Sequence, residues 1–439
     1  MIKTFLKRLS LVAGALTLVL LLSVSWYYGK SPLFVARITL RGIALRAIGL
    51  CVAAHDPSPK PILCATGPAA TSKSCMGTSV TFETLTQDVN MIFPRSYVTI
   101  KFSENSPIRR SRYSFSYQPA SDPQLAVLRD NYRLSHLILP TNDDFENITR
   151  IVDWVHGQWC HGTSGAGDFN PGEFDADAII THARHGDRFW CQVYAMTFVQ
   201  VAASLGFQAR LVSLTKDGYV SSDMHAVAEV WSNRYDKWIV VDPDFNIWYT
   251  RKGIPLNALE IHNAVIARAV DTIKIVKGVR RSGGEFESRI PKLYGYYRYF
   301  YVDMRNDWLT NRYFPGHPKR SDSATLFWDD PRLPSVLTLM TQTNSPHDLY
   351  WDINKTHACV GQPDIRTMNL PVYIDTLTPN YTHFEIVVDG AQSIPENTAE
   401  FAWKLHVGRN SLAICSVNAF GHRGIPAKIA IDIERGQGR

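Results

Sequence analysis

Three residues in the middle of the chain are of the types that cooperate in nucleophilic catalysis: Cys191, His225 and Asp242. A cysteine thiolate can attack a carbonyl carbon, a histidine can take and return the proton, and a carboxylate can hold the imidazole in orientation. The three can act together only if their side chains meet in space. That condition depends on the helices and strands that carry them.

The segment that begins at Cys191 is predicted to be an amphipathic helix. Its apolar residues recur at three- and four-residue steps: Ala195, Phe198, Val199, Ala202 and Leu205. Gly206 then ends the pattern, as glycine often does after a helix. At a helix N-terminus, unpaired backbone N–H groups and the positive end of the dipole favour a thiolate over a thiol. The helix therefore places the cysteine where its nucleophilic form is stabilised.

Three strands are predicted downstream of this helix. Residues 207–214, 225–231 and 238–241 are rich in strand-forming side chains. Residues 232–236 have the composition of a turn, so the last two strands should form a hairpin. His225 is the first residue of that hairpin and therefore lies on a rigid element.

The register of the hairpin decides whether the histidine meets a carboxylate. If Trp231 pairs with Trp238, His225 lies diagonally across from Asp242 on one face, within reach of a hydrogen bond. A slip of one residue would send the two side chains to opposite faces. Asp244 is the rival partner, but it follows a proline, which cannot donate to the ladder and should end the strand. We therefore predict that Asp242 orients the imidazole.

This segment resembles the transglutaminase-like superfamily, whose papain-like fold is shared by transglutaminases, peptide N-glycanases and many bacterial envelope proteins. The specificity of the resemblance comes from several spaced elements together, because each alone would be weak. They are Cys191 opening a helix, Tyr194-Ala195, Gly206-Phe-Gln-Ala-Arg210, His225 with Glu229-Val230, and Trp238-Ile-Val-Val-Asp242-Pro243. Leu128 to Leu134 and the predicted helix that follows are similar to the lead-in of the bacterial members.

The resemblance implies acyl transfer from an amide through a thioester. Cys191 would attack the carbonyl, His225 would move the proton and Asp242 would orient the imidazole. Water or an amine would complete the reaction, so hydrolysis and cross-linking both remain open. Family members commonly carry an aromatic residue two places after the histidine, whereas this chain has Val227, so substrate contacts made by that ring are not expected.

Two residues upstream of the nucleophile are candidates for holding the oxyanion, Gln158 and Trp159. In this fold an amide or indole there can join the backbone N–H of the cysteine in that role, and simple packing is the alternative. His156, Cys160 and His161 have the side chains of zinc ligands, but no second ligand pair stands at finger-like spacing. We predict no metal and no cofactor.

The charge of the chain is concentrated at its N-terminus. Residues 1–50 hold seven of the 46 basic residues and no acidic one, which leaves 39 basic and 40 acidic residues in the remainder. Such a balance gives no reason to expect nucleic acid as a partner. A hydrophobic content of 45% is ordinary for globular proteins.

An apolar run from Leu9 to Val24 follows a basic start and ends in the aromatic group Trp26-Tyr-Tyr28. Aromatic side chains stand where signal cleavage would need small ones, which favours an uncleaved signal anchor. The arginines of the following apolar segment disfavour a second span and favour a helix against the headgroups. We expect a single-pass membrane protein of a bacterial envelope, with its catalytic domain outside the cytoplasm.

The chain has seven cysteines, and six remain if Cys191 is a free nucleophile. An oxidising compartment would allow three disulfides. We predict the pairs Cys64 with Cys75 and Cys359 with Cys415, although spacing alone does not determine connectivity.

From about residue 331 the sequence changes to short alternating runs separated by Pro, Asn, Asp and Gly, which is typical of a β-sandwich. Its last runs, Val407 to Gly421, resemble the final hairpin of bacterial immunoglobulin-like modules. The aromatic run Leu293 to Tyr301 is expected to fill the core rather than to line a sugar or peptide groove.

We therefore predict an α+β protein with a papain-like, transglutaminase-type core. Its partners would be a protein or peptide amide substrate or a glycan, and the membrane. The alternative function is a catalytically silent binding or scaffold protein of an envelope polysaccharide or secretion assembly. The predicted parts are a transmembrane signal anchor (1–30), a juxtamembrane segment and linker (31–80), the transglutaminase-like domain (81–330) and an immunoglobulin-like β-sandwich (331–439).

Overall fold

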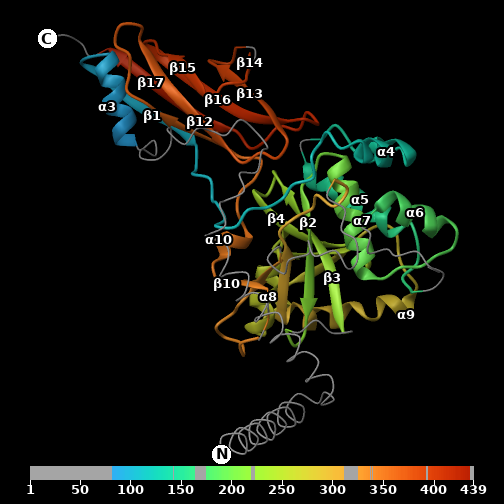
Figure 1. Cartoon of the computed structure of the whole chain (residues 1–439). Coiled ribbons are helices and arrows are strands. Elements are labelled where there is room, and N and C mark those ends of the chain that lie inside the picture. Colours follow the sequence, from blue (N-terminus) through green and yellow to red (C-terminus); the bar gives the residue numbers. More distant parts are fainter. Residues whose placement is uncertain are drawn as a thin grey trace, which may run out of the picture. The chain divides into compact units, whose positions relative to one another are not determined.

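The computed structural model describes residues 82–435 apart from 142, 164–174, 219–222, 311–324, 337, 339 and 392–393. Contacts between residues divide the chain into two units, Met1–Leu63 and Cys64–Arg439, and all described residues lie in the second. This unit contains a core of helices and sheet and a β-sandwich (Figure 1). The predicted α+β class is confirmed.

The core is built on a mixed sheet that has nine strands among the described residues. The strands are β2 (Ala209–Thr215), β3 (Met224–Ser232), β4 (Lys237–Asp242), β5 (Ile247–Arg251), β6 (Ile254–Pro255), β7 (Lys274–Lys277), β8 (Tyr299–Asp303), β9 (Thr325–Trp328) and β10 (Thr341–Thr343). They lie in the order β10-β9-β8-β2-β3-β4-β5-β6, with β7 also paired with β5. β3 lies between β2 and β4 and is antiparallel to both, so the predicted hairpin is at the centre of the sheet.

Helices cover both faces of this sheet. On one face lie α4 (Pro123–Asn131), α5 (Asp144–His156), α6 (Ala176–Arg184) and α7 (Cys191–Ser204), which share a hydrophobic core with alternate residues of β3. On the other lie α8 (Ala258–Ile266) and the 3₁₀ helix η4 (Ile290–Arg298). The short helix α9 (Gly284–Glu287) precedes η4.

The helix α7 is buried around its whole circumference. Every residue from Val193 to Ser204 is buried, because β2 and β3 cover one side and α4, α5 and α6 contact the other. An amphipathic helix was the expectation from its spacing. The helix has instead the all-round apolar surface of a central helix.

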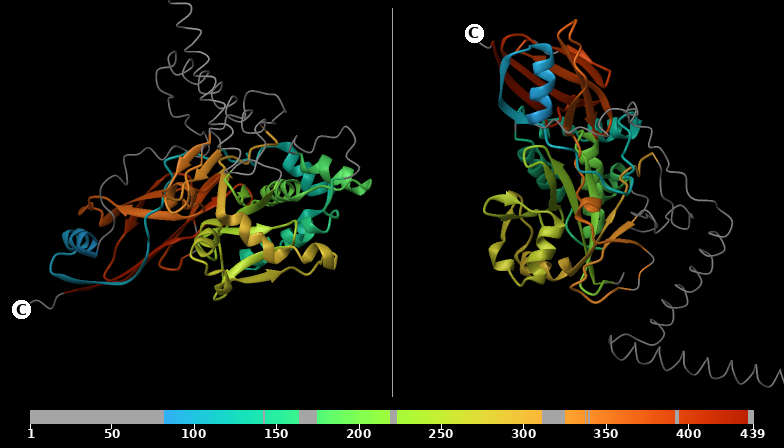
Figure 2. Two further views of the ribbon diagram at one scale, coloured as in Figure 1. Left: turned by 90° about the horizontal axis from the view of Figure 1, so that it is seen from below. Right: turned by 90° about the vertical axis from the view of Figure 1, so that its left-hand side faces the viewer.

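The sandwich consists of two sheets that share one hydrophobic core, in which Trp403 is fully buried. The five-stranded sheet has the order β1-β17-β16-β13-β14, and the three-stranded sheet the order β11-β12-β15, both counted within the described residues. The elements are α3 (Phe82–Ile92), β1 (Ser96–Glu104), β11 (Thr356–Val360), β12 (Asn369–Thr376), β13 (Tyr381–Val388), β14 (Ile394–Glu396), β15 (Glu400–Lys404), β16 (Gly408–Asn418) and β17 (Ala427–Arg435). Figure 2 shows α3 beside these strands in both views.

The strand pairing differs from both predicted limits of the catalytic domain, residues 81 and 330. β1 lies in the segment assigned to the catalytic domain, yet it pairs with β17 of the sandwich, and α3 packs on the sandwich core. β10 lies beyond residue 331, yet it pairs with β9 of the core sheet. The short helix α10 (Pro346–Leu349) and Ile353 also contribute to the core. The sandwich therefore combines 82–104 with the strands that begin at 356.

The cysteines differ from the prediction at one pair. Cys359 is disulfide-bonded, whereas Cys415 has a free thiol, so the predicted Cys359–Cys415 bond is wrong. Cys415 is partly exposed and lies between Ile414 and Ser416, which are buried, so its thiol projects away from the sandwich core. The predicted pair of Cys64 and Cys75 lies outside the described residues.

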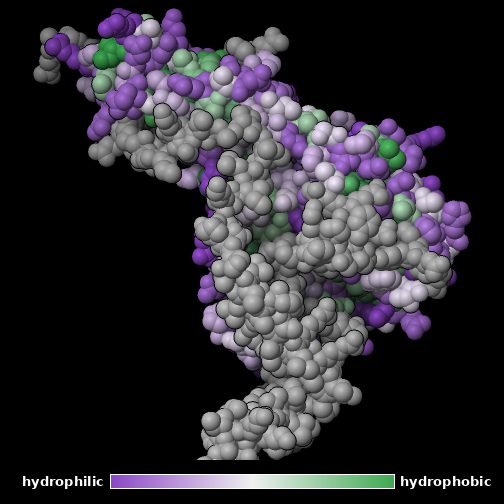
Figure 3. Space-filling view, in the orientation of Figure 1, coloured by the Kyte–Doolittle hydropathy of each residue, from purple (hydrophilic) through white to green (hydrophobic). Residues whose placement is uncertain are grey.

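The predicted anchor (1–30) and the segment 31–80 likewise lie outside the residues that the structure describes. Within those residues, none of the helices is both long and apolar enough to cross a membrane. Figure 3 shows that hydrophilic residues cover most of the described surface on the face in view, with apolar residues scattered among them.

Candidate functional site

The β3–β4 hairpin has the register that its two tryptophans predicted. Trp231 pairs with Trp238, and both side chains lie on the face that packs against α8 and η4. On the same face, Nε2 of His225 lies 2.7 Å from Oδ2 of Asp242. The predicted hydrogen bond between this histidine and this carboxylate is therefore confirmed.

Asp242 is held from several sides. Its side chain is fully buried, and Oδ1 accepts hydrogen bonds from the backbone N–H groups of Asp244 (3.1 Å) and Phe245 (3.2 Å). Oδ2 is left to the imidazole. The turn after β4 therefore holds the Asp242 carboxylate in a fixed orientation.

Cys191 is the first residue of α7, as predicted. The residue before it, Trp190, forms no side-chain cap, so no cap side chain occupies the first N–H groups of the helix. The thiol is partly exposed, and a hydrogen bond joins it to His225. Cysteine, histidine and aspartate therefore form a continuous chain of contacts from a helix N-terminus to a central hairpin.

The surroundings of His225 set its protonation. Burial alone lowers the pKa of this imidazole, but the charge of Asp242 and the hydrogen bonds to Asp242 and Cys191 raise the pKa well above its ordinary value of 6.5. A protonated imidazole stabilises a neighbouring thiolate. The arrangement thus favours a protonated His225 beside the sulfur of Cys191.

A second carboxylate lies in the same place. One ligand-type atom of each of Cys191, His225 and Asp244 lies within 4.8 Å of the other two. Asp244 does not bond to the imidazole of His225; its oxygens lie 2.9 and 3.0 Å from Nδ1 of His161. Burial raises the pKa of Asp244, and the pair with His161 opposes that rise.

Comparisons with known proteins agree with this geometry. Residues 134–243, which include all three residues of the site, match the model of the transglutaminase-like superfamily. Residues 134–243 therefore form a transglutaminase-like domain. Among solved structures, the crystal structure of red sea bream transglutaminase is similar over 80% of this chain and 78% of its own, with 10% sequence identity and a TM-score of 0.22. No curated protein matches the chain.

The two oxyanion candidates of the transglutaminase-like domain have different surroundings. Nε2 of Gln158 donates a hydrogen bond to the carbonyl of Trp154 (2.7 Å), one turn back. The indole of Trp159 is buried beside Phe189 and Tyr194, and its N–H has no hydrogen-bond partner among the described residues. An unpaired buried donor is uncommon, so the indole N–H of Trp159 is a donor that could still be used by a ligand.

The residues that the sequence analysis considered for zinc do not form one cluster. His156 contacts the carbonyl of Pro243 and the hydroxyl of Ser282. Cys160 is an exposed free thiol. His161 pairs instead with Asp244. Within the described residues, the cluster of ligand-type atoms is the one formed by Cys191, His225 and Asp244.

The motif residues Arg210 and Glu229 form a buried ion pair between β2 and β3. Both side chains are fully buried and lie 2.6 Å apart, and Glu229 also accepts hydrogen bonds from the backbone of Ala258 and the hydroxyl of Tyr350. The Arg210 guanidinium lies 4.2 Å from the ring centroid of Trp238. The resemblance pointed to these residues by their spacing, and the structure places them opposite each other on β2 and β3, the second of which carries His225.

Aromatic side chains that the sequence analysis did not single out surround the imidazole. Phe245 lies edge-on to His225 at 5.6 Å, and Tyr296 lies 5.9 Å from it. Phe286 stacks on Phe245 and also contacts His161. The sequence marked the run around Tyr296 only as aromatic, and most of that run is core, as predicted. These rings reduce the access of water to the histidines.

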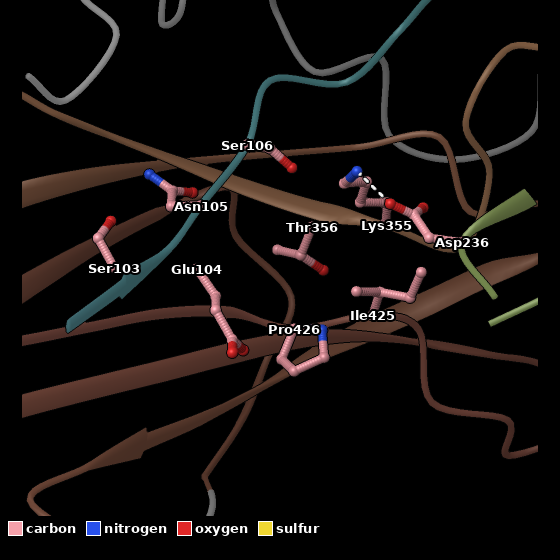
Figure 4. A pocket seen from close by; sticks show the side chains of 9 residues that line it. All are labelled: Ser103, Glu104, Asn105, Ser106, Asp236, Lys355, Thr356, Ile425 and Pro426. Carbon is pink, nitrogen blue, oxygen red and sulfur yellow. Dashed lines mark hydrogen bonds and ion pairs between the residues drawn. The ribbon is translucent and has the colours of Figure 1, made fainter. Parts of the chain in front are cut away.

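A separate polar cavity of about 450 Å³ lies elsewhere in the unit and is lined by none of the site residues. Among the described residues that line it, the cationic side chain is Lys355. Its Nζ lies 2.8 Å from Oδ2 of Asp236 (Figure 4) and 3.5 Å from Oδ2 of Asp352. A paired cation has little tendency to bind a substrate anion. This cavity is therefore not the reactive site, and the reactive groups of the transglutaminase-like domain are those at Cys191. The cavity is lined by Ser103, Glu104, Asn105, Ser106, Asp236, Lys355, Thr356, Ile425 and Pro426.

Proposed function

We propose that this protein is a cysteine enzyme that cleaves or transfers amides of proteins or peptides through a thioester. The observation that carries the proposal is the contact chain Cys191–His225–Asp242 inside a transglutaminase-like domain. It provides a nucleophile, a general base and an orienting carboxylate, which is the set that covalent catalysis on an acyl group requires.

In the first half of the reaction, Sγ of Cys191 attacks the amide carbonyl carbon. The S–C bond forms, and the carbonyl electrons move onto oxygen. The backbone N–H of the helix start and the unpaired indole N–H of Trp159 are the proposed donors to this oxyanion. His225 then gives its proton to the leaving nitrogen, the C–N bond breaks, and a thioester and a free amine remain.

In the second half, water or a primary amine attacks the thioester. His225 takes a proton from the attacking atom while Asp242 keeps the imidazole in place, and the C–S bond breaks to return the Cys191 thiolate. The product is a carboxylic acid if the acceptor is water and a new amide if it is an amine. The proposal includes both hydrolysis and acyl transfer, because the two reactions use the same residues.

We also propose that the enzyme works outside the cytoplasm, attached to the cell membrane by the apolar segment Leu9 to Val24. The disulfide at Cys359 supports this placement, because disulfides persist mainly in oxidising compartments. Two measurements test this placement. Fractionation of cells that express the full chain shows whether the protein is in the membrane, and protease treatment of intact spheroplasts shows on which side the catalytic domain lies. Degradation of the catalytic domain only after the membrane is broken would contradict the proposed orientation.

The decisive experiment for the chemistry is to trap the acyl-enzyme. The full chain is mixed with a glutamine-containing peptide in the presence of a chelator, and intact mass is measured at short times. We expect an adduct that equals the peptide minus ammonia, located on Cys191, lost in Cys191→Ala and retained in the matched variant Cys160→Ala. Adding a primary amine then separates acyl transfer from hydrolysis.

The alternative is a catalytically silent binding or scaffold protein. It predicts that Cys191 reacts with a small alkylating agent but never forms an acyl adduct with any amide of a peptide library. That result, with the fold intact, would replace the enzymatic proposal.

A further inference from the structure

The carboxylate of Asp244 is not explained by the proposed reaction. Asp244 is only 1% exposed, and within the described residues its carboxylate pairs with His161. Burying a carboxylate without a strong cationic partner costs free energy. A group kept under such conditions beside a reactive thiol suggests a further role at this position.

The carboxylate, the thiol and the imidazole have the spacing of a metal site that needs only a small closure. Their ligand atoms lie within 4.8 Å of one another. In a tetrahedral zinc site with bonds of about 2.0–2.3 Å, ligand atoms lie about 3.4–3.6 Å apart. The three atoms would therefore approach one another by no more than about 1.4 Å, a movement that side-chain rotation can supply.

The groups behind these ligands are those that hold metal ligands in other proteins. Metal-binding histidines usually give their second ring nitrogen to a carboxylate. His225 has this arrangement, because its Nε2 bonds to Asp242 and its Nδ1 is the ring nitrogen that could bind a metal. Asp244 is held in turn by His161, whose side chain is 27% exposed. Cys191 is the first residue of α7, and its sulfur is one of the ligand types that zinc binds.

We infer that Cys191, His225 and Asp244 form a binding site for a thiophilic divalent cation such as Zn²⁺, with Asp242 and His161 as outer hydrogen-bond partners. A thiolate, an imidazole and a carboxylate suit zinc better than magnesium or calcium, which prefer oxygen ligands alone. The two negative ligands neutralise the charge of the ion. A fourth position stays open toward solvent, because Cys191 is partly exposed.

The consequence for the proposed enzyme is reversible silencing. A bound ion occupies the lone pairs of the Cys191 thiolate and the Nδ1 atom of His225, which are the groups that attack and that transfer the proton. Metal and acyl substrate therefore exclude each other. This consequence rests on the proposed function, but the metal site itself does not, because it can be measured without any substrate.

The test is a titration of the metal-free full chain with Co²⁺, a spectroscopic substitute for zinc. We expect one equivalent to bind with the near-ultraviolet absorption of a cobalt–thiolate bond, and Zn²⁺ to displace it. Cys191→Ser should abolish that absorption. The exposed thiol of Cys160 provides a matched control, because Cys160→Ser should leave it unchanged.

Two further variants test the carboxylate and its partner. His161→Gln removes an outer partner and should weaken Co²⁺ binding about 10- to 100-fold, and Asp244→Asn, which removes a ligand, should weaken it by more than that. Thermal unfolding and iodoacetamide labelling of Cys191 without metal show whether each variant is folded.

Failure would take one of two forms. If the wild-type chain binds Co²⁺ without thiolate absorption, or if folded Asp244→Asn binds it as tightly as the wild type, the site does not exist as described. Because the acyl-enzyme experiment is done with a chelator present, its failure and the failure of the metal site are separate results.

Discussion

Nε2 of His225 lies 2.7 Å from Oδ2 of Asp242, although the two residues are 17 positions apart and belong to different strands. The hydrogen bond leaves only one ring nitrogen, Nδ1, to face Cys191. Asp242→Asn removes the negative charge but keeps the size of the side chain. The imidazole should therefore stay in the site but no longer be held in the correct orientation.

We therefore expect Asp242→Asn to slow turnover less than His225→Ala does. Loss of the general base should cost about 10²- to 10⁴-fold in kcat. Steady-state kinetics with the peptide substrate measure both variants, and circular dichroism checks that each is folded. A larger loss in Asp242→Asn than in His225→Ala would mean that the carboxylate does more than orient the base.

The thiol of Cys191 should be the most reactive of the described free cysteines. The imidazole of His225 is in contact with it and it opens a helix, and both features make a cysteine a better nucleophile. Burial, by contrast, raises the pKa of Cys415 to about 11. Iodoacetamide at pH 6 should therefore label Cys191 first in the unreduced protein, as peptide mapping would measure. Equal or faster labelling of the exposed Cys160 would count against the nucleophile.

The shift of the His225 pKa should change direction, from raised to lowered, when Asp242 is replaced by asparagine. In the wild type the pKa of His225 is raised above 6.5, so the protonated form contributes stability below pH 6.5, and this contribution is lost as the pH rises through the folded-state pKa. In Asp242→Asn the carboxylate charge is gone and burial remains, which lowers the pKa. NMR titration of the His225 ring should show the decrease. An unchanged pKa would show that Asp242 does not set the protonation of the site.

The sequence predicted the helix and hairpin of the site because local signals determine them. A glycine stop, a tryptophan pair and a proline set the end of α7 and the register of β3 and β4. The pairing of His161 with Asp244, 83 positions apart, could not be predicted, because no periodic pattern links a loop residue to a residue beyond a strand end. Cys359 is disulfide-bonded as predicted, but its predicted partner Cys415 was wrong for a related reason, since counting cysteines gives no partner.

The buried ion pair between β2 and β3 should be important for stability. Arg210 and Glu229 are both fully buried, and removing one charge leaves the other uncompensated. Glu229→Gln should lower the free energy of unfolding by about 3–5 kcal/mol, as chemical denaturation would measure. The double variant Arg210→Met with Glu229→Leu should recover part of this loss. If the double variant were no more stable than Glu229→Gln, the unpaired charge would not be the cause.

The sandwich should fail to fold as the C-terminal segment alone. β17 pairs along its length with β1, from Ser96 opposite Arg435 to Glu104 opposite Lys428. Without residues 82–104 that edge is unpaired, and Val89 of α3 no longer covers the sandwich core. A long exposed edge strand favours aggregation over folding.

A fragment of residues 355–435 should therefore give no cooperative melt by circular dichroism. The matched control joins residues 82–104 to its C-terminus through a flexible linker, which is feasible because the start of β1 lies beside the end of β17. This rearranged chain should melt cooperatively with a β-rich spectrum. If the shorter fragment folded equally well, β1 would be an accessory to the sandwich, and the boundary near residue 331 that the sequence suggested would be closer to the folding unit.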